Sequence, residues 1–312
     1  MAVDHQNIAS ADADKTNWVD RFAPPFSIPY LRLMRADRPI GSWLLLLPCW
    51  FGLGLAAAQG ASPPWLYYGF LFAIGAFVMR GAGCAYNDIV DVDFDAKVER
   101  TAQRPIPSGQ VSIQRAWIFL VGLSLVGLVV LLQFNFFTIV FCVSSLALIA
   151  AYPFMKRITW WPQLWLGLTF NWGALAGYSA ATGTLNAAPL FIYLGCIFWT
   201  LGYDTIYAHQ DKDDDALIGV KSTARRLGEK TKPMLVVFYG MTIALFAVSG
   251  AVSNFGLIYF LALAAPACHF IWQVRALRIN DSAQCLMLFK SNRNAGFLLL
   301  APMLLETLTK AA

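Results

Sequence analysis

Two short stretches of this chain, residues 87–95 and 204–215, hold nine of its 18 acidic residues, and each follows an apolar segment of membrane-spanning length. The nine carboxylates are Asp88, Asp91, Asp93, Asp95, Asp204, Asp211, Asp213, Asp214 and Asp215. Carboxylates gathered at a membrane boundary repel one another and resist losing water, so a cation is expected among them. A hard divalent metal such as Mg²⁺ takes oxygen ligands and is the obvious candidate.

The spacing of the first stretch directs its oxygen atoms to one side. On a helix, Asn87, Asp91 and Asp95 lie at i, i+4 and i+8 and share a face, which Arg80 extends toward the membrane. A solvated acidic helix end is the alternative interpretation. It must also account for Arg80 at membrane depth, where a charge costs about 2.5–3.5 kcal/mol on insertion scales.

The second stretch repeats this pattern. Asp204, Asp211 and Asp215 lie at i, i+7 and i+11, again on one helix face. Mg²⁺ typically binds one or two carboxylates together with substrate phosphates. We therefore expect two facing columns of oxygen ligands that hold a Mg²⁺-bridged diphosphate. The predicted metal ligands are Asp88, Asp91, Asp95, Asp211 and Asp215.

A diphosphate also needs cationic side chains. Arg100 and Arg104 directly follow the first acidic stretch, and Lys221 follows the second. Arginine can grip phosphate oxygens through a bidentate fork, whereas lysine acts as a point charge. Basic residues in these loops can also serve only to orient the chain in a membrane, and for Lys230 and Lys232 we prefer that interpretation.

Composition predicts an all-α polytopic membrane protein. Hydrophobic residues make up 58% of the 312 positions and charged residues only 13%, about half the share in soluble domains. Apolar runs of roughly 20 residues recur, each long enough to cross a bilayer as a helix. We expect nine transmembrane helices around a central cavity. Their approximate bounds are 40–59, 65–86, 114–133, 136–154, 162–181, 188–208, 234–252, 255–274 and 294–309.

Basic residues predict the topology. The connections near 60–64, 134–135, 182–187 and 253–254 contain no Lys or Arg, whereas the alternate connections contain nearly all of them. The positive-inside rule then places the N-terminus and both acidic stretches on the cytoplasmic side, with the C-terminus opposite. The acidic N-terminal segment resembles neither a signal peptide nor a transit peptide. A bacterial cell inner membrane is therefore expected.

The domain organisation follows from these spans. Residues 1–38 are expected to form a cytosolic tail, partly disordered up to about Phe22, and residues 39–312 a single membrane domain. A weak duplication relates 40–154 to 162–274, with one helix added. Asn171, a polar residue inside the fifth span, would make either a helix–helix hydrogen bond or a substrate contact, and we favour the hydrogen bond. Scattered cysteines and histidines argue against a zinc site.

Several motifs resemble the UbiA-type intramembrane prenyltransferases. The run NDIVDVDFDAKVERTAQRPIPSGQVS (87–112) resembles the NDxxDxxxD signature and its RTxxRPxxSG continuation. YDTIYAHQDKDDDALIGVKST (203–223) resembles the second motif, read as Asp211 to Asp215, and YPFMK (152–156) resembles the YxxxK motif. DRPIG (37–41) resembles the entry to the first helix. The resemblance covers roughly residues 30–310 and is greatest to the subgroup that prenylates 4-hydroxybenzoate.

The resemblance implies Mg²⁺-dependent transfer of a polyprenyl group from polyprenyl diphosphate to the ring carbon ortho to the hydroxyl of 4-hydroxybenzoate, in ubiquinone biosynthesis. Asp91 and Asp211 are then counted as catalytic, together with Asp204, which would orient or deprotonate the phenol. One departure is Val92, where many members carry a polar or basic residue, so Arg100 or Arg104 must supply that contact. The remaining predicted substrate contacts are Arg38, Arg80, Asn87, Tyr152, Lys156 and Arg157.

Two alternatives stay open. One is a UbiA-type enzyme with another acceptor, namely homogentisate, a naphthoate or haem. The other, from a different class, is an ion-coupled transporter that uses membrane aspartates. Transporters place such groups near the bilayer midplane, whereas these aspartates cluster at one face beside basic loops, which favours diphosphate binding.

Overall fold

The computed structural model of this chain describes residues 16–96, 99–210, 212–217 and 219–311, and in these residues every regular element is helical. The expected all-α class is therefore confirmed. The chain divides into two compact units. The first comprises Met1–Ser42 and Gly75–Val129, and the second comprises Trp43–Ile74 and Val130–Ala312. This division follows packing and does not test the duplication expected from the sequence.

The first unit contains two short N-terminal helices and the acidic end of a long one. Its elements are α1 (Trp18–Phe22), α2 (Ile28–Leu33), the latter part of α4 (Trp65–Val90), α5 (Val92–Asp95), α6 (Glu99–Ala102) and most of α7 (Ile113–Leu131). One apolar cluster packs Leu33 with Ala85 and Ile89 of α4. A second joins Val19, Met34 and Ala36, with Phe77, Phe119 and Leu123 packed against it.

This packing corrects one expectation about the N-terminus. The segment up to Phe22 was predicted to be partly disordered, yet residues 18–22 form α1. Asn17 caps this helix through a hydrogen bond from the backbone N–H of Asp20, and Val19 is fully buried. A capping side chain and a buried apolar residue are sufficient to order so short a helix against its neighbours. Residues 1–15 lie outside the described part.

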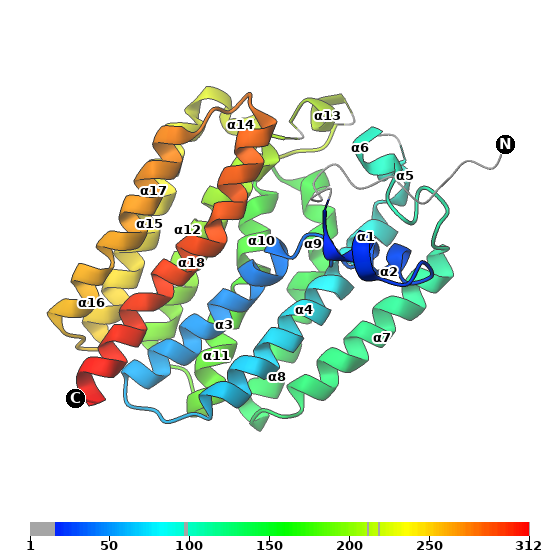
Figure 1. The fold of residues 1–312 in the computed structure, drawn as a ribbon. Helices are drawn as coiled ribbons and strands as arrows, with labels where there is room; N and C mark the ends of the chain where they lie inside the picture. Colours follow the sequence, from blue (N-terminus) through cyan, green and yellow to red (C-terminus); the bar gives the residue numbers. More distant parts are fainter. Residues whose placement is uncertain (1–15, 97–98, 211, 218, 312) are drawn as a thin grey trace. The chain divides into compact units, whose positions relative to one another are not determined.

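The second unit is a helical bundle. Its elements are α3 (Ile40–Ala58, from Trp43), the start of α4, α8 (Phe136–Ser144), α9 (Leu146–Ile158), α10 (Pro162–Phe170), α11 (Trp172–Thr182), α12 (Ala187–Ala208), α13 (Lys212–Leu217), α14 (Thr223–Leu227), η1 (Gly228–Lys230), α15 (Thr231–Val252), α16 (Leu257–Ala262), α17 (Ala264–Ala276) and α18 (Ser282–Ala311). Figure 1 shows α15, α17 and α18 side by side.

Close helix contacts in this unit depend on small residues. At the contact of α3 with α11, a Cβ atom added to Gly177 would collide with the backbone of Cys49, and one added to Gly52 would collide with the backbone of Ala174. Small residues at such crossings allow helix backbones to approach closely, as is typical of membrane proteins. Gly52 and Gly177 therefore allow the backbones of α3 and α11 to pack closely where the two helices cross.

Seven helical segments of the described chain are long and apolar enough to cross a membrane. They are Ile40–Ala58, Trp65–Val90, Ile113–Leu131, Phe136–Ile158, Ala187–Ala208, Thr223–Val252 and Leu257–Ala276. The predicted count of nine is not confirmed. The expected span 162–181 is divided into α10 and α11 at Asn171, and the expected span 294–309 lies within α18, which also contains Lys290, Arg293 and Glu306.

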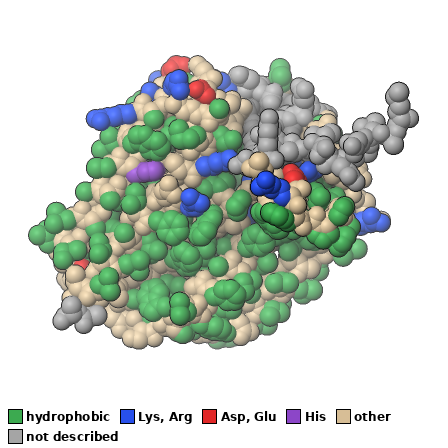
Figure 2. All heavy atoms as spheres, viewed as in Figure 1, with side chains coloured by type: hydrophobic (Ala, Val, Ile, Leu, Met, Phe, Trp, Pro, Cys, Tyr) green, Lys and Arg blue, Asp and Glu red, His purple; other side chains and the backbone are tan. Residues whose placement is uncertain are grey.

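The surface agrees with a membrane environment. Over α17 and α18, hydrophobic side chains cover much of the face drawn in Figure 2. Side chains such as Leu257, Leu261 and Ile271 are 71%, 65% and 49% exposed. Large apolar side chains are exposed along whole helices when lipid rather than water surrounds them.

Candidate active site

The first acidic stretch keeps its predicted column, with one interruption. α4 ends at Val90, Asp91 leaves the helical conformation (φ −101°, ψ 7°), and α5 begins at Val92. The backbone N–H of Asp91 still donates to the carbonyl of Asn87 at 2.9 Å, and that of Asp95 donates to the carbonyl of Asp91 at 2.9 Å. The i, i+4, i+8 relationship therefore survives the break.

Three carboxylates of this stretch are buried. Asp88 and Asp91 have no exposed surface, and Asp95 is 7% exposed. Buried carboxylates are costly unless they are paired with positive charge. Their concentration at the end of a long helix therefore requires cations contributed by other parts of the unit.

Two arginines supply that positive charge. Arg35 Nη2 donates to both oxygens of Asp88, at 2.7 and 2.9 Å. Arg104 Nη1 donates to Asp95 Oδ2 at 2.6 Å and to Asp88 Oδ1 at 3.3 Å. Burial lowers the pKa of the Arg35 guanidinium, but the Asp88 carboxylate raises it, so the net pKa lies above its ordinary value. Asp88 thus accepts hydrogen bonds from both arginines.

The loop that carries Arg104 is ordered by its own hydrogen bonds. Thr101 Oγ1 donates to the carbonyl of Asp95 at 2.8 Å, and the backbone N–H of Arg104 donates to the carbonyl of Thr101 at 2.9 Å. Ser108 Oγ in turn donates to the Arg104 carbonyl at 2.7 Å. These bonds explain why an RTxxRPxxS pattern directs Arg104 toward the acidic stretch. The side chain of Arg100 lies outside the described part.

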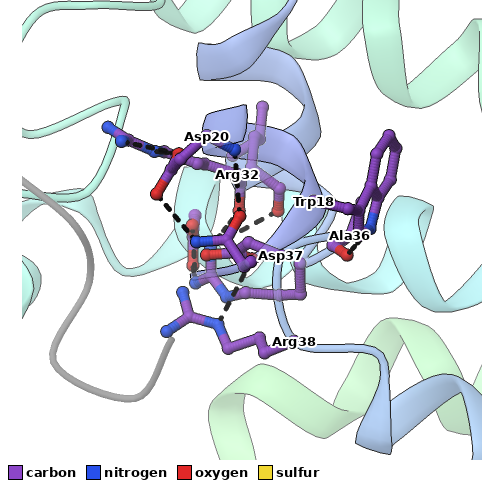
Figure 3. Close-up of polar contacts among 10 residues, drawn as sticks. Trp18, Asp20, Arg32, Ala36, Asp37 and Arg38 are labelled. Atoms are coloured by element: carbon purple, nitrogen blue, oxygen red, sulfur yellow. Dashed lines mark hydrogen bonds and ion pairs between the residues drawn. The ribbon is translucent and has the colours of Figure 1, made fainter. Parts of the chain in front are cut away.

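A second polar group lies where the N-terminal segment enters α3. Asp37 is buried, and Arg38 Nε lies 3.7 Å from its Oδ1 (Figure 3). In the described part of the chain, neither oxygen of Asp37 has a hydrogen-bond partner. Burial raises the pKa of this carboxyl, although Arg38 and Arg35 act in the opposite direction.

The guanidinium of Arg80 lies close to Gly41, the second residue of α3. A Cβ atom added to Gly41 would collide with the Arg80 guanidinium, so the absence of a side chain at Gly41 leaves the space that Arg80 occupies. The predicted cations Arg38 and Arg80 are therefore both associated with the start of α3. A guanidinium in a partly buried position is a suitable partner for a carboxylate.

The second acidic stretch departs from its prediction. A column at i, i+7 and i+11 requires one continuous helix, but α12 ends at Ala208 and α13 begins at Lys212. Asp204 lies in α12, partly buried, whereas Asp211 and the side chain of Asp215 lie outside the described part. His209 is the C-cap residue of α12, and its Nε2 pairs with Thr231 Oγ1 at 2.9 Å. Burial, with a smaller effect of Lys212, lowers the pKa of His209 to about 4.

The basic loop of the second unit is attached to the end of α9. The backbone N–H of Lys221 donates to the carbonyl of Lys156 at 3.0 Å, and Lys221 Nζ donates to the carbonyl of Ile158 at 3.1 Å. Tyr152 precedes Lys156 by one helical turn on α9, and Arg157 follows it. The structure therefore brings together Lys156, Arg157 and Lys221, which are 65 positions apart at the extremes.

The pairing of Asp88 with Arg35 was missed by sequence reasoning. Sequence patterns assign no role to Arg35. No spacing rule links it to Asp88, which lies 53 positions away. Its place two residues before the DRPIG motif is the only sequence signal that could have drawn attention to it.

In the described residues, no three His, Cys, Asp or Glu side chains converge as a metal-binding set. The donor chemistry nevertheless fits Mg²⁺, which needs only one or two carboxylates and completes its shell with water and substrate phosphate. Asp91 and Asp95, four positions apart, carry the hard carboxylate oxygens that such a site would need. Both oxygens of Asp88 are already occupied by Arg35.

Comparison with known proteins places the chain. The profile of the UbiA prenyltransferase family matches residues 45–299. The mitochondrial 4-hydroxybenzoate polyprenyltransferase of Dictyostelium discoideum is 50% identical over 90% of this chain and 60% of its own length. The rat and human proteins of the same name are 50% and 48% identical, over 75% and 76% of their lengths. This chain therefore spans under two thirds of the first relative and about three quarters of the other two.

Solved structures agree. A UbiA homologue from Aeropyrum pernix K1 is 25% identical, with a TM-score of 0.71 over 84% of this chain and 97% of that protein. A homologue from Archaeoglobus fulgidus bound to GPP and Mg²⁺ is 19% identical, with a TM-score of 0.64 over 89% of this chain and 99% of that protein. The fold and these matches define a polytopic helical membrane protein of the prenyl-transferring class. The chain belongs to the UbiA prenyltransferase family.

Proposed function

We propose that this chain transfers a polyprenyl group from polyprenyl diphosphate to the ring carbon ortho to the hydroxyl of 4-hydroxybenzoate, in ubiquinone biosynthesis. The main support is identity of about 50% over 90% of the chain to relatives that carry that activity in their names. The buried carboxylates and arginines of the first acidic stretch fit the handling of a metal-bound diphosphate.

The proposed Mg²⁺ ligands are Asp91 and Asp95 of the first stretch and Asp211 and Asp215 of the second. The sequence also predicted Asp88 as a ligand. A bound Mg²⁺ would act as a Lewis acid on the diphosphate oxygens. Arg104, already directed at Asp95 and 25% exposed, is placed to contact the leaving diphosphate and stabilise its charge. Arg100 and Lys221 are proposed to add positive charge on the same group.

The acceptor is proposed to be bound by its two ends. Its carboxylate needs a cation, and Arg80 and Arg38 are the candidates in the first unit, with Lys156 and Arg157 in the second. Asp204 is proposed to orient or deprotonate the phenol, which makes the ring carbon ortho to it more nucleophilic. Asp204→Asn should then lower kcat while leaving diphosphate binding unchanged; unchanged turnover would refute this role.

The membrane is proposed to be an inner membrane. The chain was predicted to lie in a bacterial cell inner membrane, whereas the names of the relatives favour a mitochondrial one. The proposed orientation keeps the N-terminus and the acidic stretches on the cytoplasmic or matrix side. Fractionation of the native cells, followed by protease protection of tagged termini, tests both statements.

The decisive experiment is a membrane assay. Membranes containing the chain are supplied with labelled 4-hydroxybenzoate, a polyprenyl diphosphate and Mg²⁺, and the prenylated product is extracted. We expect product that disappears with EDTA and returns with Mg²⁺. Product that ignores EDTA would refute the metal, and product only from homogentisate, a naphthoate or haem would replace the acceptor. Ion flux in vesicles without any product would favour the transporter.

A further inference from the structure

Arg35 has a backbone conformation that arginine rarely adopts. Its φ is +61°, in the left-handed region, and Asn254 is the one other non-glycine residue of the described chain with positive φ. Asparagine and aspartate enter this region more readily than other residues that have a side chain, whereas a long side chain such as arginine seldom does. An outlier of this kind persists only where surrounding contacts enforce it.

The side chain of Arg35 shows what the conformation achieves. Its guanidinium is 11% exposed and grips both oxygens of Asp88, whose side chain is 1% exposed. Its Nη1 donates to the carbonyls of Arg32 at 3.0 Å and Leu33 at 3.4 Å. The guanidinium therefore links the end of α2 to the end of α4. If α2 continued through Arg35 as a regular helix, the carbonyls of Arg32 and Leu33 would instead accept hydrogen bonds from backbone N–H groups four residues further on.

The N-terminal helix pair, α1 and α2, holds this turn in place. The Trp18 indole points at the Ala36 carbonyl, and its Nε1 donates to that oxygen at 2.8 Å (Figure 3). Asp20 Oδ1 accepts from Arg32 Nη2 at 2.9 Å, also drawn in Figure 3. The backbone N–H of Ala36 returns to the carbonyl of Leu31 at 2.9 Å. Residues of α1 thus anchor Arg32, whose carbonyl accepts from Arg35, and Ala36, which follows Arg35 in the chain.

Asp88 transmits this arrangement to the rest of the acidic stretch. Its Oδ1 accepts from Arg35 and from Arg104, and Arg104 Nη1 also binds Asp95. Removal of the Arg35 guanidinium would take away the 2.7 and 2.9 Å contacts of Asp88 and leave its 3.3 Å contact with Arg104. Arg104 would then be drawn toward Asp88, because a poorly paired buried charge is costly. The 2.6 Å contact of Arg104 with Asp95 would be weakened.

We propose that Arg35 is a positioning residue, set by the N-terminal helix pair, which neutralises Asp88 so that Arg104 and Asp95 are held ready for the metal-bound diphosphate. In this arrangement Asp88 is the anchor of the acidic stretch, and Asp91 and Asp95 are its metal ligands. The inference deepens the proposed function and depends on diphosphate being the ligand of this stretch.

A series of single and double variants distinguishes an anchoring role of Asp88 from a role as metal ligand. Purified chain in lipid nanodiscs is titrated calorimetrically with inorganic diphosphate, at several Mg²⁺ concentrations. Arg35→Gln should weaken Mg²⁺-dependent binding at least tenfold, because it leaves the charged Asp88 to compete with Asp95 for Arg104. Arg35→Gln with Asp88→Asn should regain most of that loss, since a neutral amide at position 88 needs no cation and leaves Arg104 to Asp95. If Asp88 is a metal ligand, the double variant binds as weakly as Arg35→Gln or more weakly, and the proposal is overturned.

Two further variants test the geometry. Arg35→Lys keeps the charge, but its single nitrogen cannot reproduce the separate contacts of Nη2 with Asp88 and of Nη1 with the Arg32 and Leu33 carbonyls. It should therefore also weaken binding severalfold. Trp18→Phe removes only the indole hydrogen bond to Ala36 and should give a smaller loss in the same direction. Arg115→Lys, an exposed position on α7, is the matched control and should bind as the parent chain does. Wild-type affinity in Arg35→Lys and Arg35→Gln together would overturn the proposal.

The same titration separates this inference from the function itself. Failure of the parent chain to prenylate 4-hydroxybenzoate, with diphosphate binding intact, would refute the proposed acceptor and leave the role of Arg35 standing. Thermal unfolding of every variant is recorded alongside. A loss of binding that the double variant does not restore, together with an equal loss of thermal stability in all Arg35 variants, would show a role in folding alone and overturn the inference.

Discussion

The backbone N–H of Lys221 donates to the carbonyl of Lys156 at 3.0 Å, so two cations predicted separately from the sequence occupy neighbouring positions at the end of α9. Lys221 also donates from Nζ to Ile158 and therefore covers carbonyls at the C-terminal end of that helix. A cation at a helix C-terminus is favoured by the helix dipole. The loop is thus fixed on α9 even without substrate.

Lys156 is one of the four candidate contacts proposed for the acceptor carboxylate. Its proximity to Lys221 predicts instead that the two lysines act together on the diphosphate. Lys156→Met and Lys221→Met should each raise the KM for polyprenyl diphosphate severalfold. Because they share a partner, the double variant should deviate from additivity by roughly 0.5 kcal/mol or more. Steady-state kinetics with varied diphosphate measures this, with Lys232→Met on the exposed face of α15 as control. Additive effects would mean that the two ammonium groups serve different anions.

Arg104 is expected to be the most sensitive cation of the first unit. Arg104→Gln removes hydrogen bonds to two buried carboxylates, each worth about 1.5–3 kcal/mol when charged groups are involved. Since Arg104 is 25% exposed, solvent should reduce the stability loss to about 2 kcal/mol. Denaturant unfolding in detergent measures it, and kcat should fall as well. Arg115→Gln is the control, and equal stabilities would contradict the ion pairs.

Gly41 is expected to tune the acceptor site through Arg80. Gly41→Ala introduces a Cβ that collides with the Arg80 guanidinium and must displace it. The KM for 4-hydroxybenzoate should rise about tenfold, corresponding to the loss of one charge-assisted contact worth about 1.4 kcal/mol. The KM for polyprenyl diphosphate should not change. Gly83→Ala on α4, which meets no atom within 4 Å, is the matched control; an unchanged acceptor KM in Gly41→Ala would exclude Arg80.

Asp37 is expected to destabilise the folded chain at neutral pH. Burial raises its pKa above the ordinary value of 3.8, so the folded state binds a proton more readily than the unfolded state. Stability attributable to this group is therefore greatest below pH 3.8 and is lost as pH rises through the folded pKa. Asp37→Asn should raise the Tm at pH 7.5.

The pH dependence of that difference is the test. The Tm advantage of Asp37→Asn over the parent chain should shrink as the pH falls through the raised pKa of Asp37. Asp281→Asn, on an exposed loop where Asp281 pairs with Arg278, should show no such advantage. A Tm difference that is independent of pH, or an Asn variant less stable at pH 7.5, would contradict the stated cost of burying this carboxylate.

Asn171 is expected to hold α10, α11 and α12 together. Its Nδ2 lies 2.8 Å from Thr200 Oγ1 and 3.1 Å from the carbonyl of Cys196, both on α12. Asn171→Ala removes these bonds between fully buried groups and should cost about 1–3 kcal/mol. Unfolding in detergent measures the loss, with the exposed Asn294→Ala as control. Unchanged stability would mean that the amide is dispensable for packing.

Asn171 also illustrates how far sequence reasoning extends. Its helix–helix hydrogen bond was predicted from a polar side chain in an apolar span, and that prediction is confirmed. The break it makes between Phe170 and Trp172 was not predicted, because hydropathy reports length and composition but not backbone geometry. The same limit explains the second acidic stretch, where α12 ends at Ala208 although the carboxylate spacing suggested one helix.

The membrane character, the helical class and the two acidic stretches were determined by the sequence alone, since apolar run length and residue type are local properties that act before any long-range contact forms. The pairing of Arg35 with Asp88 and the meeting of Lys221 with Lys156 were decided only by the tertiary structure. Each joins positions more than 50 residues apart. Charged groups there are matched because burial makes an unpaired charge too costly, and that cost exists only once the chain has folded.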